Sequence, residues 1–121
     1  EKQDVYPFLE MKGRDVFKLA VTHSYDDIKT VLEKKGITPN EVKYFLLHQA
    51  NVRILDAIRH ELDLPEEKFP YNINDHGNTS SASIPMLLDE LNKDGKLKEG
   101  DYLVLSAFGA GFTSGACVLK W

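Results

Sequence analysis

The segment Val42-Lys43-Tyr44-Phe45-Leu46-Leu47-His48-Gln49-Ala50-Asn51 is the part of the chain that decides the expected fold. Its apolar run, 42–47, predicts a short buried strand that ends at His48. Asn51 is a good helix N-cap, and an amphipathic pattern follows it. The segment therefore predicts a strand, a short loop and a helix, with an imidazole at the carboxyl end of the strand. In open α/β sheets, ligands bind at such strand ends.

Helical and strand patterns continue on both sides of this segment. The last two predicted strands are separated by a connection too short for a crossover helix, so they should pair antiparallel. The whole pattern predicts a layered α/β domain in which helices pack on a mixed sheet. The expected elements are a helix at 14–35, a turn at 38–41, a strand at 42–47, a helix that Asn51 caps and Pro65 ends, a short strand at 71–74, a helix from Asn78 to Gly95, and strands at 101–108 and 113–121.

The composition is that of one globular domain. With 121 residues the chain can form a single core, and its 42% hydrophobic and 28% charged residues are ordinary values for such a domain. The net charge of -4 argues against nucleic acid as a partner. No apolar run approaches the roughly 20 residues that span a bilayer, so we expect no membrane association. A single cysteine and no visible signal peptide favour the cytoplasm, and we expect Cys117 to be a small core residue.

Three predicted loops carry the groups that could perform chemistry. The first begins at His48, the second is 76–80 with Asn78, and the third, 108–112, contains two glycines. A neutral imidazole and a carboxamide can each donate a hydrogen bond to one carbonyl oxygen and so stabilise an oxyanion or an enolate. The loops therefore suggest one side of an acyl-transfer site. The alternatives are a buried histidine in the core, an asparagine that only caps a helix, and a simple tight hairpin.

The other polar residues suggest less. His23, His60 and His76 have no pattern that indicates a role, and the first two are expected to be solvated on helices. No group of His, Cys or carboxylate residues has the spacing of metal ligands, so no metal is expected. Arg53 lies in the first turn of its helix, where it could meet a phosphate or an acidic partner or could simply be solvated.

Four ordered motifs closely resemble the β-ketoacyl-acyl-carrier-protein synthase III family. They are Met11–Lys18, His48–Ile54, Gly77–Pro85 and Ala107–Thr113, and the similarity extends to Trp121. The His-Gln-Ala-Asn form differs from the His-Pro-Gly-Gly of the related plant-type polyketide synthases. The resemblance implies a single domain, 1–121, that is the carboxy-terminal half of a thiolase-like fold, with 1–10 as an entry segment. It also implies that the amino-terminal half, which carries the nucleophilic cysteine, is absent. The chain begins without a methionine, which is a further reason to expect a fragment.

The resemblance also implies a reaction and a set of site residues. The complete enzyme would condense acyl-CoA with malonyl-acyl-carrier protein, with loss of carbon dioxide, to initiate fatty-acid biosynthesis. It would be a cytoplasmic homodimer without a cofactor, and this chain by itself would be inactive. His48 and Asn78 match the catalytic pair. The residues expected to bind substrate or partner are the backbone N–H of Ala110 in the oxyanion hole, Gly13, Phe17, Ala50 and Asn51 along the pantetheine tunnel, and Arg53 at the carrier-protein surface.

Two positions depart from some members of the family. Arg14 stands where some members have asparagine, and Ala110 replaces a glycine.

Two other functions are also consistent with the sequence. One is a different thiolase-fold acyltransferase, of the polyketide or quinolone type. The other is a noncatalytic module that binds acyl-CoA or carrier protein.

Overall fold

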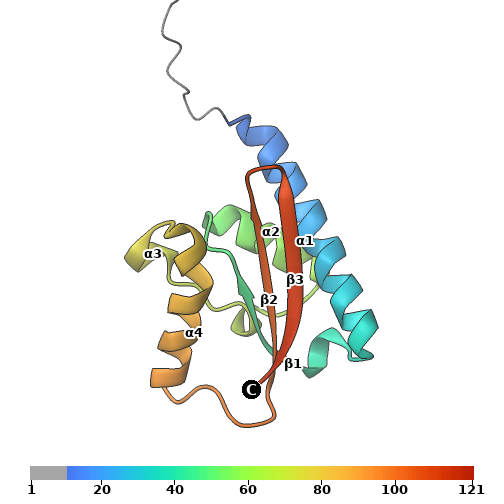
Figure 1. The fold of residues 1–121 in the computed structure, drawn as a ribbon, viewed down its shortest axis with the longest axis vertical. Coiled ribbons are helices and arrows are strands. Elements are labelled where there is room, and N and C mark those ends of the chain that lie inside the picture. The colour runs from blue at the N-terminus through green and yellow to red at the C-terminus, as the bar shows by residue number, and fades with distance from the viewer. Residues whose placement is uncertain (1–10) are drawn as a thin grey trace, which may run out of the picture.

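The computed structural model describes residues 11–121, so the expected entry segment 1–10 lies outside the described residues. Figure 1 shows the arrangement of the elements. In chain order they are α1 (Gly13–Lys35), η1 (Pro39–Glu41), β1 (Val42–Leu47), α2 (Val52–Leu62), η2 (Glu66–Lys68), α3 (Ile73–His76), η3 (Ser80–Ala82), α4 (Ser83–Lys93), β2 (Tyr102–Gly109) and β3 (Thr113–Lys120), where η marks a single turn of 3₁₀ helix.

The three strands form a mixed sheet in the order β1-β2-β3. β1 and β2 are parallel, whereas β2 and β3 form an antiparallel hairpin, as the short connection predicts. Leu47 pairs with Ser106, so β1 ends beside the last residues of β2. Consequently the carboxyl end of β1 and the β2–β3 hairpin lie at the same end of the sheet. This is the arrangement that the sequence predicts for its candidate site.

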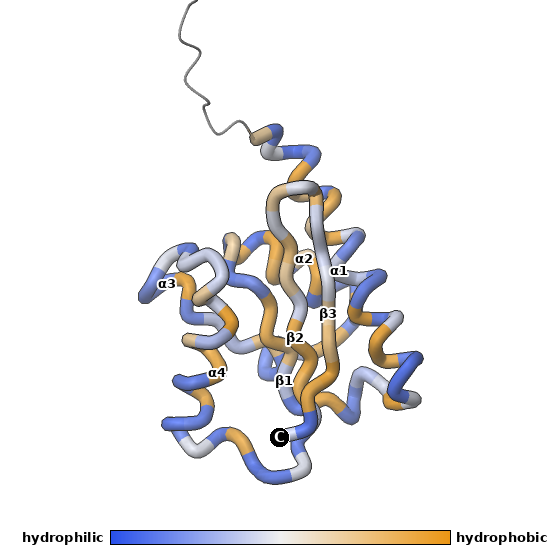
Figure 2. Tube along the Cα trace, in the orientation of Figure 1, coloured by the Kyte–Doolittle hydropathy of each residue, from blue (hydrophilic) through white to orange (hydrophobic). Residues whose placement is uncertain are grey.

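Helices cover the two faces of the sheet, as expected for a layered α/β domain. One buried cluster joins α1 and α2 to one face, where Phe45 is fully buried and stacks on Phe69 with ring centroids 4.9 Å apart. A second cluster joins Leu87 and Leu91 of α4 to Leu46 and Leu103 on the other face. Figure 2 shows the apolar residues gathered along the strands and on the inner sides of the helices.

Local signals set the ends of α1 and α2 close to where the sequence predicts them, whereas α4 begins at Ser83 and not directly after Asn78. Gly36 ends α1 in the left-handed conformation (φ 75°), and its N–H donates to the carbonyl of Leu32. The side-chain oxygen of Asn51 accepts the N–H of Ile54 at 2.9 Å and caps α2. Pro85 is the third residue of α4, where its missing N–H costs little. No helix of the described residues is long and apolar enough to cross a membrane.

Two other expectations from the sequence are wrong. Residues 71–74 do not form a strand, because the N–H of Asn72 bonds to the side chain of Gln49 and its carbonyl starts the short helix α3. Cys117 is exposed and is not a core residue. It lies on β3, on the sheet face that carries α4, but α4 contacts β1.

Candidate active site

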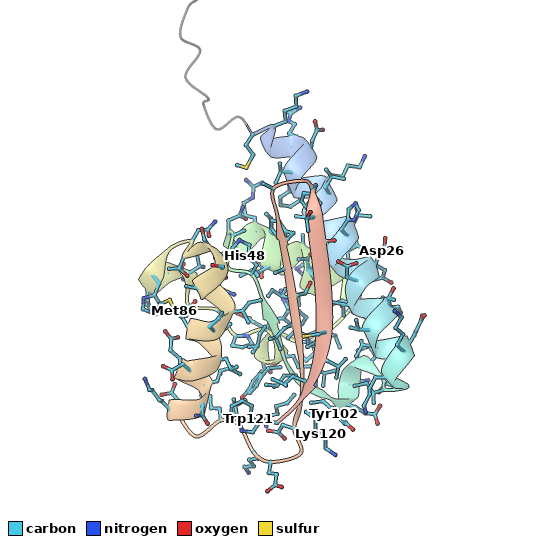
Figure 3. All side chains as sticks on the ribbon, in the orientation of Figure 1. Asp26, His48, Met86, Tyr102, Lys120 and Trp121 are labelled. Atoms are coloured by element: carbon cyan, nitrogen blue, oxygen red, sulfur yellow. The ribbon has the colours of Figure 1, made fainter. Side chains whose placement is uncertain are left out.

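His48 lies at the carboxyl end of β1, at the end of the sheet away from Tyr102 and Trp121 (Figure 3). Its backbone N–H continues the parallel pairing by donating to the carbonyl of Ser106 at 2.9 Å. The imidazole is half-buried, and the edge-to-face ring of Phe108 lies 5.3 Å from it. Burial lowers the pKa of His48 from its usual value, because it disfavours the charged imidazolium. The ring is therefore held neutral at pH 7.

Ser83, the first residue of α4, is the polar partner of this imidazole. Its Oγ lies 2.8 Å from Nδ1 of His48 and also accepts the backbone N–H of Gln49 at 3.4 Å. The serine is 2% exposed. The contact ties the start of α4 to the end of β1. Because it uses Nδ1, Nε2 is the ring nitrogen that could contact a ligand.

Asn78 lies on the segment that leads into α4, five residues before Ser83. Its side-chain oxygen accepts the N–H of Ser80 at 3.0 Å, which forms a tight Asx turn. This bond uses the amide oxygen, so the Nδ2 group is the donor that the side chain can offer to a ligand. The side chain is exposed. That Asn78 and His48 act on one oxygen stays a prediction, supported by the contact of Ser83 with His48.

A chain of hydrogen bonds holds this segment against β1. The fully buried Gln49 donates to the carbonyl of Leu47 at 2.8 Å and accepts the N–H of Asn72 at 3.2 Å. The side chain of Asn72 donates to Glu90 on α4 at 3.0 Å. The other oxygen of Glu90 lies 2.7 Å from Nε2 of His76. Residues on both sides of Asn78 are thus fixed, one through Asn72 and the other through Ser83.

The β2–β3 hairpin forms the third side of the site. Phe108, which contacts His48, stacks on Phe112 with ring centroids 5.7 Å apart, and Phe112 lies 5.3 Å from the ring of His23 on α1. Ala110 is exposed at the tip of the hairpin. The structure therefore brings the first and third predicted loops together around His48, and the second loop reaches it through Ser83.

The remaining predicted residues lie farther out or have structural roles. Asn51 caps α2, and Ala50 packs against the core beside it. Gly13 and Phe17 lie in the exposed first turns of α1, which extend beyond the sheet (Figure 1). Arg53 is exposed in the first turn of α2. Within residues 11–121 no group of three or more His, Cys, Asp or Glu side chains could hold a metal ion.

Sequence reasoning missed several residues that build this site. Ser83 lies in a quoted motif, but only its contact with Nδ1 shows its purpose. The sequence pattern gave Gln49 and Glu90 no role, because their partners are far away in the chain. His76, which the pattern left without a role, pairs with Glu90. The sequence did carry one signal for a role of Ser83, since this polar residue lies within a motif that leads into a helix.

The chain is similar to known proteins over nearly all of its length. Residues 32–121 match the family described as 3-oxoacyl-[acyl-carrier-protein (ACP)] synthase III C terminal. The β-ketoacyl-[acyl-carrier-protein] synthase III 1 of Halalkalibacterium halodurans is 50% identical over 94% of this chain, which is 36% of that protein. The chain thus spans about 36% of the length of the curated relatives it matches.

Solved structures show the same relationship. The crystal structure of 3-oxoacyl-[acyl-carrier-protein] synthase III from Aquifex aeolicus VF5 superposes with a TM-score of 0.93 and 46% identity, covering 98% of this chain and 38% of that one. A priming β-ketosynthase from the R1128 polyketide pathway has a TM-score of 0.87 and 36% identity, covering 94% and 34%. The predicted fold class, the carboxy-terminal part of a thiolase-like synthase, is confirmed. The chain belongs to the 3-oxoacyl-[acyl-carrier-protein] synthase III C-terminal family.

Proposed function

We propose that the complete protein containing this chain, called the complete synthase below, condenses an acyl-CoA with malonyl-acyl-carrier protein and so initiates fatty-acid synthesis. The observation that carries the proposal is the place of His48. A neutral, half-buried imidazole stands at a strand end between the hairpin and the start of α4, with Nδ1 bonded to Ser83. Such a ring can offer a hydrogen-bond donor to a substrate oxygen.

The proposed reaction has three steps. The acyl group first passes from coenzyme A to a cysteine in the other half of the synthase. The malonyl thioester then loses carbon dioxide, and the electron pair of the broken C–C bond moves onto the thioester as an enolate. Its oxygen would accept hydrogen bonds from Nε2–H of His48 and the amide of Asn78. The enolate carbon attacks the acyl thioester and expels the cysteine thiolate.

The proposal also assigns roles to other residues of the chain. The backbone N–H of Ala110 would stabilise the oxyanion formed when the acyl thioester is attacked. Gly13, Phe17, Ala50 and Asn51 would contact the pantetheine arm, and the exposed Arg53 would dock the acidic carrier protein. We further propose that the complete synthase is a homodimer, acts in the cytoplasm and needs no cofactor.

The substitution His48→Ala in the complete synthase tests this function. Loss of one donor to a developing oxyanion typically lowers a rate by about 10²–10³-fold, so carbon dioxide release from malonyl-carrier protein should fall by that amount. Transfer of a radiolabelled acyl group from coenzyme A to the enzyme should continue. The matched control is His60→Ala, because His60 is an exposed histidine on α2.

The outcomes separate the candidate functions. Unchanged carbon dioxide release in His48→Ala would show that the proposal is wrong. Condensation of acetyl-CoA with malonyl-carrier protein by the 121-residue chain alone would contradict the need for the other half. The 36% identity to a priming polyketide ketosynthase favours a second candidate, a synthase that starts polyketides from an unusual acyl group. Comparison of acyl-CoA substrates with the complete synthase would distinguish the two.

A further inference from the structure

The hydroxyl of Ser83 sits between two groups at the end of β1. One is the backbone N–H of Gln49, 3.4 Å from Oγ, and the other is Nδ1 of His48, 2.8 Å from it. Ser83 is 2% exposed and Gln49 is fully buried, so the hydroxyl itself lies away from solvent.

The number of hydrogen atoms at this hydroxyl decides its direction. A backbone N–H can only donate, so Gln49 occupies a lone pair of Oγ. The hydroxyl has a single hydrogen, and within residues 11–121 the acceptor that lies in reach of it is Nδ1 of His48. If Nδ1 accepts this hydrogen, it carries a lone pair. The proton of the neutral ring must then be on Nε2.

We propose that Ser83 is a positioning residue that holds the neutral ring of His48 in the tautomer protonated at Nε2, so that the ring donates to the malonyl thioester oxygen. This inference rests on the proposed function. A ring protonated at Nδ1 would instead turn a lone pair toward the substrate oxygen and repel the enolate. The serine thus decides whether His48 helps or hinders the decarboxylation.

One further contact and the burial of the ring bear on the tautomer. Phe108 packs edge-on against the ring at an interplanar angle of 78°, so the imidazole is fixed by a side chain as well as by Ser83. Burial keeps the ring neutral at pH 7, which is the state in which the tautomer matters. Ser83 from α4 and Phe108 from β2 both contact the ring, and neither side chain ionises near neutral pH.

The substitution Ser83→Ala in the complete synthase tests the role through its pH dependence. Removal of the partner that orients a functional histidine typically costs about 10–100-fold, so decarboxylation at neutral pH should fall by at least about 10-fold. Acyl transfer to the enzyme should be unchanged. The deficit relative to the unmodified synthase should shrink as the pH falls below the ordinary histidine pKa of 6.5, because an imidazolium carries a proton on both nitrogens.

A structural role alone would give a different result. If Ser83→Ala merely disturbed packing, its deficit would not depend on pH and would extend to acyl transfer, and either finding would overturn the proposal. Ser81→Ala is the matched control, because Ser81 is an exposed serine in the same segment. It should match the unmodified synthase at every pH.

A second measurement needs no serine variant and remains informative if the variant does not fold. Nitrogen-15 NMR of the unmodified complete synthase with labelled histidine should show His48 with a bare Nδ1 and a protonated Nε2. The signal is assigned by its loss in His48→Gln. A proton on Nδ1 would overturn the inference whatever reaction the synthase performs. Failure of the unmodified synthase to decarboxylate malonyl-carrier protein would instead overturn the proposed function.

Discussion

The environment of His48 shows how one side chain acquires properties that its neighbours in the chain do not specify. The ring is half-buried by groups from β2 and α4, which are 35 or more positions away in the sequence. Burial lowers its pKa, because removal from water disfavours the charged form of the ring. The lowered pKa suits a hydrogen-bond donor that must stay neutral, and it has a consequence for stability.

We expect His48 to make the folded chain less stable in acid. The pKa of its ring is lower in the folded state than the value of 6.5 that it has when unfolded, so on acidification the unfolded chain binds a proton first. The free energy of unfolding should therefore decrease as the pH falls through about 6.5 and stop decreasing, for this residue, below the folded pKa. Above that window His48 is neutral in both states and has no such effect.

Denaturant titration of the 121-residue chain between about pH 7 and about pH 5 would measure this effect. His48→Gln should lose less stability over the window than the unmodified chain does. The exposed His60 supplies the control, since His60→Gln should follow the unmodified chain. The same loss of stability in all three proteins would contradict the assignment to His48.

The segment between α2 and α4 is an element whose position depends on side chains. It has few backbone pairings of its own, and η2, α3 and η3 are single turns. Gln49 holds it at Asn72, Ser83 holds it at His48, and Glu90 joins Asn72 to His76. These hydrogen bonds give the loop that carries Asn78 a defined shape.

Gln49→Ala should loosen this segment and destabilise the chain. The buried amide satisfies the carbonyl of Leu47 and the N–H of Asn72, and each buried polar group left without a partner costs about 1–3 kcal/mol. We expect a decrease of that size or more in the free energy of unfolding, measured in urea. Faster hydrogen exchange at the amide of Asn72 should accompany it. Asn92→Ala, which truncates an exposed amide on α4, should leave both quantities unchanged.

At the level of the whole molecule, the two sheet faces are covered unequally. α1 lies along β3 and contacts β2, so that face of the sheet is covered. On the other face α4 contacts β1, and Figure 1 shows it on the side of the sheet away from β3. The face of β3 that carries Cys117 is left exposed as a result.

This arrangement predicts an accessible thiol. Cys117 of the folded 121-residue chain should react with an aromatic disulfide reagent at nearly the rate measured after unfolding in denaturant, because its side chain is exposed. The chain has one cysteine, so the absorbance change reports this residue alone. Strong protection of the thiol in the folded chain would contradict the exposed position.

The sequence by itself determined most of the elements, because their signals are local. The apolar run of β1, the cap at Asn51, the glycine at 36 and the short hairpin connection each depend on residues within a few positions of one another. The family was predicted differently, from a resemblance carried by four ordered motifs that include His48–Ile54 and Gly77–Pro85. The strand expected at 71–74 failed because a side chain, that of Gln49, took the hydrogen bond a neighbouring strand would have made.

Only the tertiary structure decided which distant groups meet. The contact of Ser83 with His48, the link between Gln49 and Glu90 through Asn72, and the exposure of Cys117 all depend on where α4 packs on the sheet. Packing is set by the summed burial of two helix faces against three strands, and no single window of sequence contains that sum. The chemistry of an imidazole is therefore visible in the sequence, whereas its protonation and orientation are consequences of the fold.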